Sequence, residues 1–159
     1  NSICDLPAMK LGQIRSTARK EQSKEPLDYI LVDYIQLANA DTKLENRYLQ
    51  VGEVARGLKE LAKELNIPVI AAAQLSRAAD TRSDKKPQLS DLRESGELEQ
   101  AADSVLFIHL DNDGNRQLIV GKQRMGPLGT IDTFYNDNMM RFENAASQTV
   151  SVRNYTEKD

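Results

Sequence analysis

Two strand-like segments of this 159-residue chain end in side chains suited to nucleotide chemistry. The apolar segment 29–33 closes on Asp33, and the later segment 69–74 closes on Gln74. The carboxyl ends of parallel strands share one sheet edge, where open α/β folds bind ligands. A carboxylate there can hold Mg²⁺ beside a nucleotide, and an amide can orient water or sense a terminal phosphate. A plain strand-end aspartate and a loop-bonded glutamine are the structural alternatives.

A pair of cations stands near the end of a further strand-like segment. Lys122 and Arg124 are two residues apart, so the period of a strand directs both side chains to one face. Two cations aimed together suit phosphate oxygens. A solvated strand edge is the structural alternative for this pair.

Other site chemistries find little support in the residue types. The lone histidine, His109, and the lone cysteine, Cys4, lack the partners that a zinc site or an internal disulfide needs. Gly121-Lys122 does not belong to a phosphate loop, because that motif needs a glycine five residues earlier and Ser or Thr afterwards. No nucleophile-base constellation for covalent catalysis is evident.

The elements that must position these residues follow from hydrophobic spacing. Helices are predicted over residues 11–20, ending near Glu21, over 48–65, and over 95–102. Strands are predicted over residues 29–33, 69–74, 105–110, 117–122, 130–135 and 139–142. The order strand, helix, strand predicts a parallel crossover, and Asp113-Gly114 predicts an antiparallel hairpin. Asn66 is expected in the left-handed conformation that ends a helix.

The stretch 77–88 has no periodicity and is predicted to be a long exposed loop. Residues 74–93 hold five basic and three acidic side chains, against a net charge of −3 for the whole chain. After this loop, Asp91 and Glu94 have the spacing of a helix capping box.

The bulk composition fits one globular domain, with 40% hydrophobic and 28% charged residues. No apolar run approaches the length of a membrane span, and the N-terminus lacks the order of a signal peptide. We therefore expect a cytoplasmic protein with no membrane partner. The negative net charge argues against a free-standing basic protein that coats nucleic acid.

Four segments, taken in order, resemble the helicase motifs of the DnaB-type replicative DNA helicases. They are LVDYIQL at 31–37, PVI through QLSR at 68–77, LSDLRESG through EQ at 89–100, and GKQRMGPLG at 121–129. The stretch 5–16 is also similar to the family segment that precedes its second strand. The resemblance covers residues 5–142.

The resemblance implies an α/β, RecA-like ATPase fold, with a mainly parallel sheet and antiparallel C-terminal strands. Residues 1–142 would form part of the helicase C-terminal ATPase domain, and residues 143–159 a polar tail. The family assembles as a homo-hexamer around single-stranded DNA, binds ATP and Mg²⁺ at subunit boundaries, and has primase and helicase loader as candidate partners.

The resemblance also assigns roles by position. Asp33 aligns with the Walker B aspartate that supports Mg²⁺ through water, and Gln74 with the residue that senses the γ-phosphate. Lys122 and Arg124 align with the pair that reaches into the neighbouring subunit's site. Family members present a loop to the DNA backbone, and its residues align with Arg93, Glu94 and Gly96.

The chain departs from the family pattern at one point. No G-x-x-x-x-G-K-[ST] phosphate loop occurs in the 159 residues. We therefore expect the first part of the fold, with the catalytic glutamate, to lie upstream, and this stretch alone to be inactive. An ATPase-dead assembly or DNA-binding module is the alternative function, and a recombinase or clock relative of the same fold is a third reading.

Overall fold

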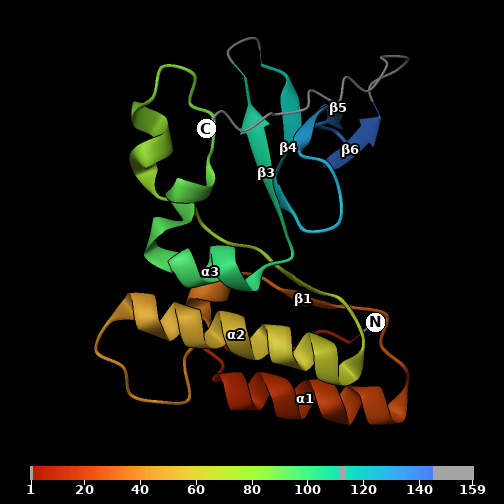
Figure 1. Cartoon of the computed structure of the whole chain (residues 1–159). Coiled ribbons are helices and arrows are strands. Elements are labelled where there is room, and N and C mark those ends of the chain that lie inside the picture. The colour runs from red at the N-terminus through yellow and green to blue at the C-terminus, as the bar shows by residue number, and fades with distance from the viewer. Residues whose placement is uncertain (1, 112–113, 145–159) are drawn as a thin grey trace. The chain divides into compact units, whose positions relative to one another are not determined.

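Helices and strands alternate along the first part of the chain, and antiparallel strands fill the last part (Figure 1). The structure is a computed structural model that describes residues 2–111 and 114–144, without the side chains of residues 93–95. The α-helices are α1 (Leu11–Lys24), α2 (Arg47–Leu65) and α3 (Gly96–Ala101). The 3₁₀ helices are η1 (Ile35–Leu37), η2 (Arg77–Thr81) and η3 (Leu89–Ser95). The strands are β1 (Ile30–Val32), β2 (Val69–Ala71), β3 (Ser104–Leu110), β4 (Arg116–Gln123), β5 (Gly129–Asn136) and β6 (Arg141–Asn144).

The chain divides into two compact units. The first unit comprises the residues up to Leu75 together with Leu92–Ala102. The second comprises Ser76–Asp91 and the described residues from Asp103 onward.

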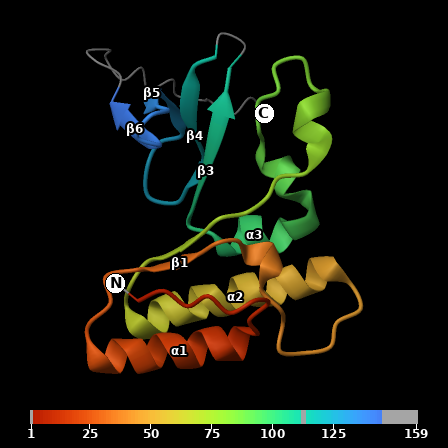
Figure 2. The ribbon, with the colours of Figure 1, turned by 180° about the vertical axis from the view of Figure 1, so that it is seen from behind.

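The first unit is built on two helices that lie side by side, α1 and α2 (Figure 2). Arg15 binds Glu60 at 2.5 Å and Arg19 binds Glu64 at 2.6 Å, so ion pairs join their outer faces. Their inner faces, with η1, enclose a core of buried apolar side chains: Leu11, Ile35, Ala38, Val54, Ala55 and Leu58. The apolar spacing of residues 48–65 therefore predicted the buried face of α2 correctly.

Helix α1 ends later than the prediction near Glu21. It runs to Lys24, and the capping residue Glu25 is extended, with φ −150° and ψ 134°. Pro26 follows directly, and a proline disfavours the helical conformation in the residue before it. The proline, rather than the end of the apolar spacing, therefore sets the end of this helix.

The predicted strand-helix-strand unit is confirmed. Strands β1 and β2 pair in parallel, with Ile30 opposite Val69 and Val32 opposite Ala71. Asn66 ends α2 in the left-handed conformation, with φ 53° and ψ 41°. Both strands are shorter than predicted, because the ladder stops at Val32 and Ala71. Beyond these residues, the two segments are joined by backbone hydrogen bonds outside the ladder.

The second unit contains a four-stranded antiparallel sheet in the order β3-β4-β5-β6. The predicted pairing of the strands around residues 105–110 and 117–122 is confirmed. In the turn between them Gly114 has φ 84°, as the turn requires, and Asp113 lies outside the described residues. The last strand, β6, lies two residues later than predicted, because a turn occupies residues 137–140. Phe107 and His109 are the buried side chains of β3.

The segment Ser76–Asp91 is more ordered than the predicted loop. Its first part forms η2, and the amide of Ser76 donates to the carbonyl of Asp91 at 3.0 Å. The carboxylate of Asp91, predicted to cap a helix together with Glu94, is buried and accepts bonds from the Arg82 side chain and the Gln88 amide. The side chain of Glu94 lies outside the described residues. In the described part of the chain, no helix is both long and apolar enough to cross a bilayer.

Candidate nucleotide and phosphate site

The carboxyl ends of β1 and β2 place Asp33 and Gln74 at one sheet edge. Asp33 follows β1 directly, and the amide of Ala72 donates to the carbonyl of Val32 at 2.9 Å. The chain after β1 then turns back, so that the amide of Ile35 donates to the carbonyl of Ala72 at 2.9 Å. Backbone hydrogen bonds therefore join the two segments beyond the ladder itself.

Gln36 fixes the position of Gln74. Its side-chain amide donates to the Gln74 carbonyl at 3.1 Å and accepts from the Gln74 amide at 3.2 Å. The guanidinium of Arg47, at the start of α2, donates to the carbonyl of Gln36. No role was predicted for Gln36, although it lies in the segment 31–37. Its position after a strand-end acid was the available signal.

The side chains of Asp33 and Gln74 are both exposed at this edge. Within the described residues, no three His, Cys, Asp or Glu side chains gather closely enough to form a metal cage. A single exposed carboxylate matches the way Mg²⁺ is usually held, by one or two carboxylates with waters and substrate phosphates. The donor set at the edge therefore fits a hydrated Mg²⁺ that arrives with a nucleotide.

Lys122 and Arg124 lie at the end of the β3–β4 hairpin. Lys122 pairs with Val105 in the ladder, and the amide of Arg124 donates to the carbonyl of Asp103 at 3.0 Å. The guanidinium of Arg124 forms an ion pair with the Asp103 carboxylate, at 3.5 Å between Nε and Oδ1. Asp103 is a second residue for which no role was predicted.

The predicted DNA-contacting residues are described only in part. The side chains of Arg93 and Glu94 lie outside the described residues, and their backbone belongs to η3. Gly96 begins α3, where a Cβ would come within 2.9 Å of the Tyr48 hydroxyl. A side chain at residue 96 would therefore have to shift the Tyr48 hydroxyl, which lies at the far end of its side chain.

An ion pair organises the segment Ser76–Asp91, which precedes the predicted DNA-contacting residues. The Arg82 guanidinium donates to both carboxylate oxygens of Asp91, at 3.0 Å for Nη1 to Oδ1, and also to the carbonyl of Lys86. The amide of Gln88 donates to the same carboxylate at 2.7 Å. The hydrogen bond from Arg82, with that of the Gln88 amide, holds the pKa of Asp91 below its usual range.

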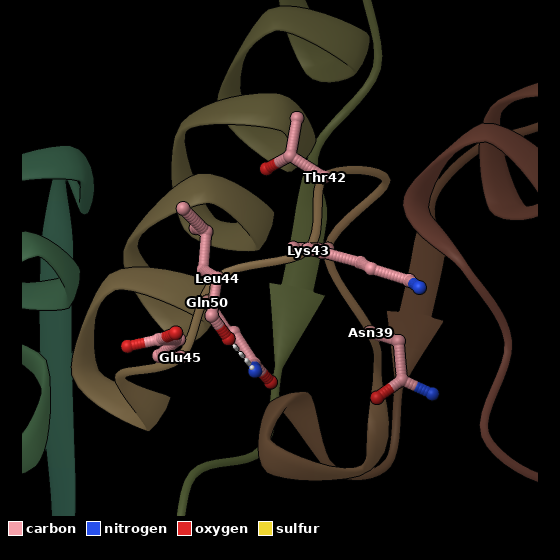
Figure 3. A pocket seen from close by; sticks show the side chains of 7 residues that line it. Asn39, Thr42, Lys43, Leu44, Glu45 and Gln50 are labelled. Carbon is pink, nitrogen blue, oxygen red and sulfur yellow. Dashed lines mark hydrogen bonds between the residues drawn. The ribbon is translucent and has the colours of Figure 1, made fainter.

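A hollow of about 410 Å³ opens in the first unit (Figure 3). It lies between the segment 39–45 and the first turn of α2, where Gln50 Nε2 donates to the Leu44 carbonyl at 2.5 Å. Lys43 and Glu45 extend from it in opposite directions in this view. Its lining residues are Asn39, Ala40, Thr42, Lys43, Leu44, Glu45 and Gln50. They include no predicted site residue, so this hollow is separate from the candidate site.

Known proteins resemble this sequence over nearly all of its length. The sequence matches the family described as DnaB-like helicase C terminal domain over residues 1–144. It is 44% identical over 155 residues to the replicative DNA helicase DnaB of Buchnera aphidicola subsp. Acyrthosiphon pisum, covering 92% of this chain and 34% of that protein. It is 40% identical over 174 residues to DnaB of Rickettsia felis, covering 94% of this chain and 35% of that protein. The chain thus spans about a third of the length of these curated relatives.

Solved structures resemble the fold closely. A structure described as an ATPase domain gives a TM-score of 0.82 at 35% identity, covering 87% of this chain and 52% of that one. A structure described as "The Structure Of A DnaB-Like Replicative Helicase And Its Interactions With Primase" gives 0.81 at 35% identity, covering 87% and 36%. These matches confirm the predicted RecA-like α/β fold and favour neither alternative reading. The chain belongs to the DnaB-like helicase C-terminal domain family.

Proposed function

We propose that these residues are part of a replicative DNA helicase that couples ATP hydrolysis to translocation on single-stranded DNA and to duplex unwinding. The relatives that match nearly all of the chain are replicative DNA helicases. The observation that carries the proposal is the hydrogen-bonded strand edge, where an acid and an amide follow two parallel strands. Such an edge is where α/β folds bind nucleotides.

In this proposal, Asp33 supports Mg²⁺ through water and Gln74 senses the γ-phosphate of ATP. Bound Mg²⁺ neutralises charge on the phosphate oxygens. Gln36 forms hydrogen bonds with the backbone of Gln74 at two points, so the side chain of Gln74 extends from a fixed main-chain position. A γ-phosphate that moves this side chain would then act on the segment that follows it.

Lys122 and Arg124 are proposed to reach the nucleotide of an adjacent protomer in a homo-hexamer. Both stand at the end of one hairpin, and cations there would stabilise charge on the transferring phosphoryl group. In the same proposal, the DNA backbone is contacted by Arg93, Glu94 and Gly96. A few phosphate contacts per protomer, repeated around a ring, allow a subunit with net charge −3 to hold DNA.

The remaining assignments also rest on the family. Residues 1–142 would belong to the ATPase domain and 143–159 to a polar tail, acting in the cytoplasm at the replication fork. One solved relative is described with its interactions with primase, so primase is a proposed partner here, as is a helicase loader. Because residues 1–159 contain no phosphate loop, we propose that this stretch alone does not hydrolyse ATP.

The test is Asp33→Asn in the full-length protein that carries these residues. Loss of the carboxylate should lower single-stranded-DNA-stimulated ATP turnover at least about 100-fold, since metal charge stabilisation contributes several kcal/mol. Asp28→Asn is the matched control, because this exposed carboxylate precedes β1 at its opposite end. It should leave turnover unchanged.

Two results would contradict the proposal. One is equal turnover in Asp33→Asn and the unmodified protein, which would remove Asp33 from the nucleotide site. The other is Mg²⁺-dependent ATP turnover by residues 1–159 alone that Asp33→Asn abolishes, which would show that no phosphate loop is needed.

A further inference from the structure

The ladder of the β3–β4 hairpin continues past its last assigned pair. Val105 pairs with Lys122 and Ser104 with Gln123, so the next pair in this register is Asp103 with Arg124. The hydrogen bond from the Arg124 amide to the Asp103 carbonyl, 3.0 Å long, belongs to this continuation. Directly opposed residues share one face of a sheet. Asp103 therefore lies on the face that carries both Lys122 and Arg124.

A β-bulge selects that face. Leu106 pairs with Val120 whereas Val105 pairs with Lys122, so Gly121 is an additional residue in β4. In an unbroken strand Lys122 would share the face of Val120, because side chains alternate with a period of two. The bulge moves it, and Arg124 with it, to the other face.

The additional residue, Gly121, has no room for a side chain. A Cβ there would lie 2.4 Å from Cε2 of Phe107, whose ring is buried. Phe107 lies on β3, on the same face as Val105. The buried ring therefore packs against the additional residue from the face that carries the cations.

The Asp103–Arg124 ion pair is long and exposed, so another anion can replace the carboxylate. Its Nε to Oδ1 distance is 3.5 Å, and both side chains are about half exposed, at 51% and 55%. Exposed ion pairs are weak, and a phosphate group carries more negative charge than a carboxylate and also accepts two hydrogen bonds from a guanidinium. The carboxylate can thus restrain a long side chain without competing strongly with a phosphate.

We propose that Asp103 is a positioning residue for Arg124, holding its guanidinium at the hairpin end until a nucleotide phosphate replaces the carboxylate. This inference rests on the proposed phosphate-binding role of Arg124 and adds to it the residue that orients the side chain before the phosphate arrives. Orientation of a charged group before reaction contributes to rate, because no reorganisation is then needed at the reaction step.

The test compares Asp103→Ala, Asp103→Asn and Arg124→Ala in the full-length protein. Asp103→Ala should lower kcat for ATP about 10-fold and leave KM within about twofold, since misplacement of one group costs one to two powers of ten in rate. The kcat of Asp103→Asn should lie between those of Asp103→Ala and the unmodified protein, because the asparagine amide oxygen still accepts a hydrogen bond. Arg124→Ala should lose about three powers of ten.

A second readout separates positioning from folding. Trapping by ADP with aluminium fluoride, which mimics the transferring phosphoryl group, should weaken about 10-fold in Asp103→Ala while ADP affinity stays within about twofold. Asp137→Ala is the matched control, since it removes the carboxylate of another Arg–Asp pair of the second unit, Arg116–Asp137 at 3.3 Å. It should match the unmodified protein in both measurements.

Each outcome has one meaning. Unchanged kcat and trapping in both Asp103 variants, with turnover lost in Arg124→Ala, overturns the positioning role and leaves the proposed function intact. Unchanged turnover in Arg124→Ala overturns the proposed function at this residue. Equal losses of ADP affinity and trapping in Asp103→Ala mean a structural role and overturn the inference, and if this variant does not fold, Asp103→Asn decides in its place.

Discussion

The strand edge of the first unit and the hairpin end of the second present their candidate residues by different means. At the strand edge, hydrogen bonds to the backbone fix the chain around Asp33 and Gln74, including the two bonds between the Gln36 side chain and the Gln74 backbone. At the hairpin end, the backbone of Arg124 is held in the same way, but its side chain is restrained as well, by Asp103.

The difference follows from the length of the side chains. Asp33 has few rotatable bonds, so a fixed backbone leaves its carboxylate few places to go. Arginine carries about 2 kcal/mol of rotamer entropy, so a fixed backbone alone leaves its guanidinium widely spread. A short acid can therefore be positioned by the main chain, whereas a long cation also needs a side-chain partner.

Breaking the support of the strand edge should have the largest effect on stability. Leu58 is buried in the core against which Val32 and Val69 pack. Leu58→Ala should lower the free energy of unfolding by about 2–5 kcal/mol through lost burial and a cavity. Urea unfolding measures the change, and hydrogen exchange should rise in peptides that span residues 30–36 and 69–74.

The control for this variant lies on the same helix. Leu49 is 46% exposed, so Leu49→Ala should change the free energy of unfolding by no more than about 0.5 kcal/mol. If both variants unfold at the same urea concentration, the strand edge does not depend on the core beneath it.

The second unit should show a pH dependence that arises from the Arg82–Asp91 pair. Asp91 has a lowered pKa in the folded protein, so its stabilisation is full above the unfolded pKa of about 4. It is lost as the pH falls through the folded pKa. Asp91→Asn should therefore cost about 1–3 kcal/mol at neutral pH, where a charged hydrogen-bond partner is removed, and less in acid.

The measurement is the free energy of unfolding between neutral pH and about pH 3, a range that crosses the ordinary aspartate pKa. The gap between the unmodified protein and Asp91→Asn should narrow as the pH falls. A constant gap would mean that the carboxylate charge of Asp91 does not hold the segment Ser76–Asp91.

The smallest effect is expected where the strand edge relies on one side chain. Gln36→Ala removes the two hydrogen bonds to the Gln74 backbone, at 3.1 and 3.2 Å, and should cost about 1 kcal/mol. Amide exchange at Gln74 should speed up. Gln117→Ala is the control, because that side chain donates to the Asp132 side chain, in the other unit. Equal exchange at Gln74 in both variants would show that Gln36 is not the clamp.

Much of the local structure could be predicted from the sequence because its causes are local. The apolar stripe of α2, Asn66 at its end and Gly114 in the hairpin turn each act within a few residues. The errors have local causes too. Pro26 rather than the apolar stripe sets the end of α1, and the Arg82–Asp91 pair orders a segment that lacks apolar periodicity.

Sequence reasoning also named the candidate residues Asp33, Gln74, Lys122 and Arg124, because strand ends and charge spacing are visible in one dimension. It missed Gln36 and Asp103, which act on residues 38 and 21 positions away. No spacing rule joins residues so far apart. Their roles depend on which strands pair and in which register.

The sequence by itself determined the family, the order of the elements and the residue types available at each strand end, since these depend on composition and short-range spacing. Tertiary structure decided which side chains meet: the amide of Gln36 with the Gln74 backbone, the Asp103 carboxylate with Arg124, and the additional residue Gly121 with the buried ring of Phe107. Strand register is set by packing across the whole sheet, where a shift of one residue turns every side chain to the opposite face.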